Sequence, residues 1–251
     1  LAALSSSDAL SEKENSSENA DGINNNEGTT CNEFLCQTGE NRNLNQYWYS
    51  KKTIEVLCSA IREALSISKG SRVAFLSTPS LFFSLSSKER ERCALFDVSS
   101  DCWYCLLRHR GDNSHQFGHF LTRQFDTSWE SCSGYHFYDY NDPTNVDESC
   151  RGVFDLIVMD PPFISQSVWE NYATTARLLS KNEITSIIAT TVDENAVLMK
   201  ALFNCKPTLF RPSIPHLVYQ YSVFANFSSS VLAERNLELG DDKELSPLKW
   251  K

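Results

Sequence analysis

Basic side chains are scarce in this chain. Its 251 residues include 23 Lys and Arg against 32 Asp and Glu, which gives a formal net charge of −9. Eight of the acidic residues but only one basic residue lie within residues 1–40, so the rest of the chain, with 24 acidic and 22 basic residues, is nearly neutral. Proteins that hold long nucleic acids need a basic surface against the phosphates. The composition therefore argues against a protein that binds long DNA or RNA.

Long apolar runs are missing as well. No run approaches the roughly 20 residues that a membrane span requires. The nine cysteines follow no regular spacing, which in a chain of this length indicates reduced thiols rather than a disulfide framework. Reduced thiols are typical of a cytosolic or nuclear protein, and we expect a cytoplasmic one.

The two ends of the chain offer little material for a core. Residues 1–43 are acidic, rich in Ser and Asn and poor in large apolar side chains, so we predict a disordered segment. Residues 229–251 are again polar, and we predict a C-terminal tail there. A single folded domain is expected over residues 44–228.

Strand and helix patterns alternate within this domain. Ser50, followed by apolar residues at helical spacing, predicts a helix over residues 51–66. Further helices are predicted from the break after residue 77 to about residue 91, over 167–181 and over 193–203, and strands over 72–77, 135–140, 153–159, 183–190 and 217–226. The strand at 153–159 is apolar on both faces, which is typical of a central parallel strand. The pattern predicts an α/β fold, a mostly parallel twisted sheet with helices on both faces and an antiparallel late strand.

Polar residues follow three of the predicted strands. They are Ser77-Thr78-Pro79-Ser80, Asp139-Tyr140-Asn141 and Asp160-Pro161-Pro162-Phe163. Open parallel sheets bind their ligands at the carboxyl ends of the strands. We therefore predict a binding site where these three segments meet.

The segment Asp160-Pro161-Pro162-Phe163 has groups that could hold an amine. Proline has no N–H, so the turn presents carbonyl oxygens as unpaired acceptors. The Asp160 carboxylate and the Pro161 carbonyl would together accept from one –NH2 group, and Phe163 offers a flat face to its carrier. The amine could belong to a purine ring or to a lysine. The alternative is a turn that only ends the strand, with Phe163 packed in the core.

This motif, placed after an apolar strand, resembles the amino-methyltransferase motif of the S-adenosylmethionine-dependent, Rossmann-like class I enzymes. Three further segments in the same order and spacing resemble the elongation factor 1-alpha N-lysine methyltransferase family: Asn45-Gln46-Tyr47-Trp48-Tyr49-Ser50, Ser77-Thr78-Pro79-Ser80 and Phe137-Tyr138-Asp139-Tyr140-Asn141. That family was once labelled as N6-adenine-specific DNA methyltransferases because of its D-P-P motif. The resemblance covers about residues 44–227.

The resemblance implies S-adenosylmethionine as the cofactor and roles for individual residues. Ser77, Thr78 and Pro79 would pass the methionine part of the cofactor, although the glycine-rich turn usual at this place is missing. An acid at the end of the second strand would take the ribose hydroxyls, and Asp126 is preferred over Asp97 for this role.

Other roles follow from the same resemblance. Asp139, within the segment that continues to Tyr140 and Asn141, would accept from the adenine amino group of the cofactor; an Asx turn is the alternative. Three aromatic residues, which could equally be core residues, would cover the cofactor: Tyr47, Trp48 and Tyr49. The target amine would be bound by the amino-methyltransferase motif, which consists of Asp160, Pro161, Pro162 and Phe163.

Residues 98–124 do not fit the family pattern. Phe96-Asp97 stands before this segment and Phe125-Asp126 directly after it, and deletion of the 27 residues would restore a sequence that resembles the family's second strand. We interpret the segment as a possible retained in-frame intron; a variable surface loop is the ordinary alternative. A zinc site is a third reading, but its spacing is shorter than in a zinc finger, so no metal is predicted. The ligands of such a zinc site would be Cys102, Cys105, His109, His115 and His119.

The resemblance implies a protein-lysine N-methyltransferase that uses S-adenosylmethionine and acts on translation elongation factor 1-alpha. We expect a monomer with a protein substrate and without membrane or nucleic-acid partners. One alternative is an N6-adenine methyltransferase acting on RNA or DNA, which the D-P-P-F motif also permits. A second is an inactive splice product or a binding module.

Overall fold

The computed structural model describes residue 40 and residues 46–66, 69–98 and 132–240. The predictions for residues 1–39, for Asp126 and for the suspect segment beyond Val98 lie outside these ranges.

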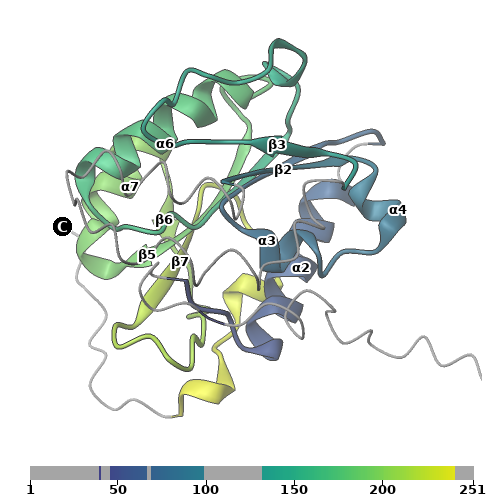
Figure 1. Ribbon diagram of the computed structural model, residues 1–251. Helices are drawn as coiled ribbons and strands as arrows, with labels where there is room; N and C mark the ends of the chain where they lie inside the picture. The colour runs from purple at the N-terminus through teal and green to yellow at the C-terminus, as the bar shows by residue number, and fades with distance from the viewer. Residues whose placement is uncertain (1–39, 41–45, 67–68, 99–131, 241–251) are drawn as a thin grey trace, which may run out of the picture. The chain divides into compact units, whose positions relative to one another are not determined.

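The described residues form a seven-stranded sheet with helices packed on it (Figure 1). The strands are β1 (Val73–Leu76), β2 (Cys93–Asp97), β3 (Tyr135–Phe137), β4 (Leu156–Met159), β5 (Ser186–Val192), β6 (Lys206–Pro207) and β7 (Tyr221–Ala225). The α-helices are α2 (Lys51–Ser66), α3 (Pro79–Phe82), α4 (Ser87–Arg90), α6 (Gln166–Leu179) and α7 (Ala196–Phe203). Short 3-10 helices are η3 (Glu148–Cys150), η4 (Asp193–Asn195), η5 (Val231–Ala233) and η6 (Leu237–Leu239). Among these elements no helix has the length and apolar character that a membrane span requires.

The strand order across the sheet is β3-β2-β1-β4-β5-β7-β6. The strands from β3 to β5 in this order are parallel, whereas β7 runs antiparallel to both β5 and β6. This arrangement confirms the predicted Rossmann-like class and the antiparallel late strand. The chain builds outward from β1 in one direction through β2 and β3, and in the other through β4 and β5. The carboxyl end of β1 is therefore the topological switch point at which such sheets bind ligands.

The strands are apolar on both faces because each face supports a separate core. Along β1, Ala74 and Leu76 join the core beneath α6 and α7, while Val73 and Phe75 join the core beneath α2 and α3. Figure 1 shows α6 and α7 on one side of the sheet and α2 with α3 on the other. The continuous apolar pattern of the sequence thus reflects two buried faces.

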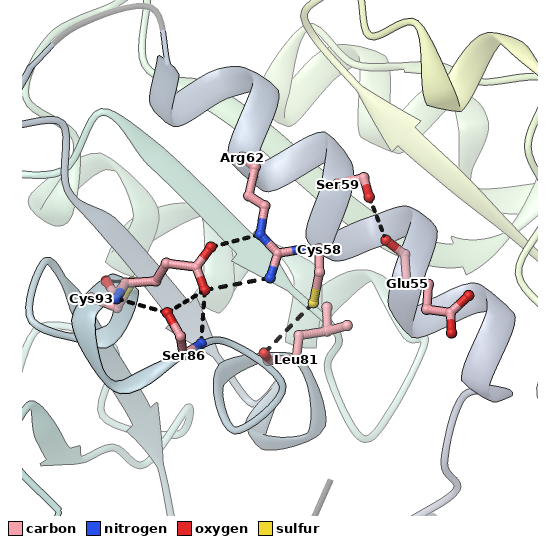
Figure 2. Close-up of polar contacts among 8 residues, drawn as sticks. Glu55, Cys58, Ser59, Arg62, Leu81, Ser86 and Cys93 are labelled. Atoms are coloured by element: carbon pink, nitrogen blue, oxygen red, sulfur yellow. Dashed lines mark hydrogen bonds and ion pairs between the residues drawn. The ribbon is translucent and has the colours of Figure 1, made fainter. Parts of the chain in front are cut away.

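Helix α2 begins and ends as the sequence predicts. Ser50 caps it, since its Oγ accepts from the backbone N–H of Thr53 at 3.1 Å. On its outer surface Arg62 Nε donates to Glu89 Oε1 at 2.6 Å, which ties α2 to α4 (Figure 2). Glu89 also accepts from Ser86 at the start of α4. The hydrogen bond from Arg62 is the main reason that the pKa of Glu89 falls to about 2.

The prediction of one helix that runs to about residue 91 is wrong, because two short helices occupy this part of the chain. Helix α3 ends at Phe82, and Ser86 starts α4 with a capping box to Glu89. The helix predicted over 193–203 begins with the 3-10 turn η4. The two-residue edge strand β6 was not predicted, since Lys206 and Pro207 carry no strand pattern.

The fold extends beyond the predicted start of the C-terminal tail at residue 229. Leu232 is 2% exposed, and its carbonyl oxygen accepts from the backbone N–H of Phe210 at 3.0 Å. Ser229 Oγ donates to Glu63 Oε2 of α2 at 2.5 Å. Asn236 Nδ2 donates to the carbonyl oxygen of Arg211 at 2.9 Å. Residues 229–240 therefore pack on the domain, although their composition is polar.

Candidate active site

A cavity of about 210 Å³ lies at the carboxyl ends of β2, β1 and β4. Each of these three neighbouring strands contributes a polar residue: Asp97 ends β2, Ser77 follows β1 and Asp160 follows β4. Most of the residues predicted for the site line this cavity together. They are Tyr47, Trp48, Ser77, Thr78, Pro79, Tyr140, Asp160, Pro161, Pro162 and Phe163.

The turn after β1 has a backbone that normally calls for glycine. Ser77 has a φ of 55°, in the left-handed region, which costs a non-glycine residue about 1 kcal/mol. Two contacts hold it there: its backbone N–H donates to the Phe96 carbonyl at 2.9 Å, and its Oγ lies 2.6 Å from the Tyr172 hydroxyl. The chain thus makes the tight turn at the switch point without a glycine.

Thr78 presents an unpaired hydroxyl at this turn. The residue stands at the N-cap position of α3, yet its side chain makes no capping hydrogen bond. Thr78 is 2% exposed, and its Oγ1 has no hydrogen-bond partner among the described residues. A buried hydroxyl without a partner is costly, and because Thr78 lines the cavity a ligand there could supply the partner.

Asp97 places a carboxylate on the β2 side of the cavity. Its Oδ1 accepts from the backbone N–H of Val98 at 2.8 Å. Burial raises its pKa to about 7. The sequence preferred Asp126 for an acid at this place, but Asp126 lies outside the described residues. The structure brings its competitor, Asp97, to the predicted position at the end of the second strand.

Asp160 places a second carboxylate on the β4 side. Its Oδ2 accepts from the Tyr49 hydroxyl at 2.5 Å, and that hydroxyl lies 2.7 Å from Thr190 Oγ1. Burial raises the pKa of Asp160 to about 6, although the hydrogen bond from Tyr49 lowers it. Tyr49 itself is buried and is not one of the residues that line the cavity. It contacts Asp160 from the protein interior, whereas the sequence analysis expected it to cover the cofactor.

Asp139 and Asn141 do not line the cavity either, although Tyr138 and Tyr140 on either side of Asp139 do. Asp139 Oδ1 accepts from the backbone N–H of Asn141 at 2.8 Å and from its side-chain amide at 2.9 Å. This is the Asx turn that the sequence offered as the alternative. The structure therefore places Asp139 outside the lining of the cavity, with one oxygen engaged by its own turn.

Aromatic and aliphatic side chains make up most of the remaining wall. Tyr140 packs between Phe163 and Tyr172, with ring centroids 6.4 and 6.3 Å away. The segment between β6 and β7 and the first residue of β7 add residues that the sequence analysis missed: Ile214, Leu217, Tyr219 and Tyr221. Two acids, Asp97 and Asp160, and no Lys, Arg or His belong to the described lining.

Glu40 joins this segment to the residues before α2. Its Oε1 accepts from the backbone N–H of Trp48 at 3.0 Å, and its Oε2 lies 2.5 Å from His216 Nδ1. Gln46 also lines the cavity, and its buried Oε1 has no hydrogen-bond partner among the described residues. No local sequence pattern signals the contact between Glu40 and His216, because these residues are 176 positions apart.

Within the described ranges, no group of three or more His, Cys, Asp or Glu side chains could hold a metal ion. The cysteines and histidines of the suspect segment lie outside those ranges.

The family model described as "Probable N6-adenine methyltransferase" matches residues 40–229. The chain belongs to this family. Its methyltransferase character therefore rests on a match that spans the whole described domain up to η5. The family's description names adenine as the methyl acceptor.

Curated relatives of the chain carry a different acceptor in their names. "EEF1A lysine methyltransferase 1" of Gallus gallus is 28% identical over 194 residues, which cover 76% of this chain and 78% of the relative. A protein-lysine N-methyltransferase of Dictyostelium discoideum is 27% identical over 201 residues, covering 80% and 83%. "Protein-lysine N-methyltransferase EFM5" of Saccharomyces cerevisiae is 25% identical over 206 residues, covering 76% and 73%.

Solved structures are more distant. A chain of the fibrillarin/Nop5p complex aligns with a TM-score of 0.32 and 14% identity over 67% of this chain and 81% of that chain, a similarity too low to carry an argument.

Proposed function

We propose that this methyltransferase transfers the methyl group of S-adenosylmethionine to a lysine side chain of a protein, and that the protein is translation elongation factor 1-alpha. The observation that carries the choice of lysine is the wall of the cavity, which combines two acids with aromatic and aliphatic side chains and has no basic residue among its described members. The names of the curated relatives support both the lysine and the elongation factor.

The residues around the switch point fit the cofactor. The unpartnered Thr78 hydroxyl, at the turn after β1, suits a polar group of the methionine part, together with Ser77 and Pro79. Asp97 at the end of β2 suits the ribose hydroxyls, by the same logic as the acidic residue of dinucleotide sites. Hydroxyl donors would also stabilise a carboxylate that now has little to offset its burial. When bound, S-adenosylmethionine supplies a methyl group that is already activated by the positive charge on its sulfur.

On the other side of the cavity, the segment from Asp160 to Phe163 would bind the target amine. The Asp160 carboxylate and the Pro161 carbonyl are acceptors for its N–H groups, and Phe163 with Tyr140 forms an aromatic wall. A methyl acceptor must offer a lone pair, so the lysine must be neutral. An apolar wall lowers the pKa of an ammonium group, whereas the Asp160 carboxylate raises it. We therefore assign Asp160 an orienting role, with the proton of the ammonium passing to water.

Adenine in a nucleic acid is the competing acceptor, and the description of the family names it. A nucleic acid would bring phosphates to the mouth of the cavity, where Lys and Arg normally meet them. The described lining has Asp97 and Asp160 instead. Aliphatic walls such as Ile214 and Leu217 suit the methylene chain of a lysine. These contacts favour lysine.

Since a translation factor works in the cytoplasm, we also propose that the protein is located there. We further propose that it acts as a monomer.

The test is methyl transfer from labelled S-adenosylmethionine to purified elongation factor 1-alpha, to RNA and to DNA in parallel. We expect label in the protein only, and recovery of methyllysine after hydrolysis of the labelled protein. Label in RNA or DNA as N6-methyladenine, with none in the protein, would refute lysine as the acceptor. An absence of cofactor binding in calorimetry would refute the enzyme itself and favour the inactive alternative.

A further inference from the structure

Three distant parts of the chain meet behind Asp160. Tyr49 comes directly before Ser50 and α2, Asp160 follows β4, and Thr190 lies within β5. Tyr49 is 6% exposed and Thr190 is 3% exposed. The Tyr49 hydroxyl lies 2.5 Å from Asp160 Oδ2 and 2.7 Å from Thr190 Oγ1. We propose that Tyr49, supported by Thr190, is a positioning residue that holds the Asp160 carboxylate in place for the target amine.

The chemistry of the three groups fixes the direction of these hydrogen bonds. An ionised carboxylate can only accept, so the Tyr49 O–H donates to Asp160. The Tyr49 oxygen is then free to accept, and the Thr190 hydroxyl donates to it. The hydrogen bonds therefore form a chain that runs from Thr190 through Tyr49 to Asp160. It fixes one carboxylate oxygen from the protein side, while the Asp160 side chain still lines the cavity.

Burial of Thr190 argues against proton transfer along this chain of hydrogen bonds. Thr190 is buried within β5, between β4 and β7. A proton passed from Asp160 to Tyr49 and on to Thr190 would reach the interior of the sheet rather than water. The chain is therefore suited to hold the carboxylate, and the proton of the substrate must leave through the cavity.

A hydrogen-bond donor behind Asp160 also keeps it charged. Burial raises the pKa of this carboxyl to about 6, and the hydrogen bond from Tyr49 lowers it. Without the Tyr49 donor the carboxyl would be protonated at a higher pH, and a protonated oxygen no longer accepts from the amine.

Asp97 lines the same cavity as Asp160, and the other described titratable groups that face Asp160 are tyrosines. They are Tyr49 before α2, Tyr172 of α6 and Tyr221 of β7. Burial raises the pKa of each above the ordinary value for tyrosine. Between pH 6 and pH 9 these tyrosines stay neutral, whereas Asp97, with a pKa of about 7, titrates as well. Because Asp97 is the same in the wild type and in a variant of Tyr49, a difference between their pH profiles is assigned to Asp160.

The experiment compares the wild-type chain with Tyr49→Phe, which removes only the hydroxyl. The first measurement is the pKa of the Asp160 carboxyl by carbon NMR, and we expect it to rise by about one pH unit in the variant. The second is kcat for methyl transfer to elongation factor 1-alpha from pH 6 to pH 9. We expect kcat to fall roughly sixfold at pH 6.5 and about twofold at pH 9, because more of the carboxyl is ionised at high pH.

Thr190→Val provides a second variant with the same expected direction and a smaller effect, and it replaces Tyr49→Phe if that protein does not fold. Thr185→Val is the matched control. Thr185 is also buried, and its Oγ1 donates to the Phe154 carbonyl at 3.3 Å, but it precedes β5 at the end away from the cavity. We expect this control to keep the wild-type pH profile.

An unchanged pKa of Asp160, or a ratio of variant to wild-type kcat that stays constant across pH, would overturn the positioning role. The rate measurement rests on the proposed function, but the NMR measurement needs neither cofactor nor substrate. A failure to methylate elongation factor 1-alpha would therefore be distinguishable from a failure of this inference.

Discussion

The carboxylates of this protein differ between the contact of α2 with α4 and the ends of the strands. Glu89 of α4 accepts from Arg62 of α2 and has a pKa of about 2. Asp97 and Asp160 line the cavity, and burial raises their pKa values to about 7 and about 6. Neither takes part in any of the salt bridges found among the described residues.

The difference separates an acid that supports the fold from acids that wait for a ligand. Arg62 satisfies Glu89 whether or not anything is bound. Asp97 and Asp160 are held at a cost to stability, since burial penalises their charged forms. The cost is reduced when a ligand supplies donors. Hydroxyls of a ribose would do this at Asp97, and an amine would do it at Asp160.

Removal of the Asp160 carboxylate should have the largest effect on activity. We expect Asp160→Ala to lower methyl transfer at least about 100-fold, because the amine loses its orienting acceptor. Cofactor affinity, measured by calorimetry, should change much less.

Asp155→Ala is the matched control, since Asp155 precedes β4 as Asp160 follows it, and pairs with Lys181 at 2.9 Å on the surface. This control should retain most of the activity. Equal losses in the two variants would mean that the strand, rather than the carboxylate at its end, is what matters.

Asp97→Asn should act on the cofactor instead. We expect the dissociation constant for S-adenosylmethionine to rise about tenfold, because an amide is a weaker acceptor for ribose hydroxyls than a carboxylate. Titration calorimetry measures this directly. Unchanged affinity would assign the ribose to another acid and return attention to Asp126.

The same variant should be more stable than the wild type at high pH. The pKa of Asp97 is raised in the folded state, so its destabilising effect is full above about pH 7 and disappears as the pH falls toward the unfolded value near 4. Because Asp97 is partly exposed, we expect Asp97→Asn to gain only about 1–2 kcal/mol at pH 8. Denaturant unfolding of both proteins at pH 8 and pH 4.5 checks this. A gain that persists at pH 4.5 would have a cause other than the charge.

Loss of the surface pair should have the smallest effect. Arg62 is about half exposed, so Arg62→Gln should lower the free energy of unfolding by less than about 1 kcal/mol. Methyl transfer should not change. A large loss of activity in this variant would show that the link between α2 and α4 shapes the cavity, and that the two groups of carboxylates are not independent.

Local patterns in the sequence predict much of the fold. The run from Val153 to Met159 identifies the central strand β4, and the spacing after Ser50 identifies α2 with its cap. The end of the long helix predicted to residue 91 could not be found in this way. Its interruption depends on the capping box of Ser86 and on contacts of Glu89 with α2, which is distant in sequence.

The site divides in the same manner. Ser77, Thr78 and the segment from Asp160 to Phe163 follow strands, so their place at the cavity could be predicted from the order of elements. The resemblance implied that Tyr49 covers the cofactor together with Tyr47 and Trp48. The sequence of an aromatic cluster does not reveal which of its rings turns inward. Its contact with Asp160 spans 111 residues and becomes visible only when α2 and β4 are packed together.

A crystal structure of the protein with S-adenosylhomocysteine bound would examine both acids at once. We predict that the ribose hydroxyls lie within hydrogen-bond distance of the Asp97 carboxylate and that the sulfur points toward Asp160. A nucleoside bound elsewhere, or a ribose held by a different acid with Asp97 turned away, would contradict the division of labour between these two carboxylates.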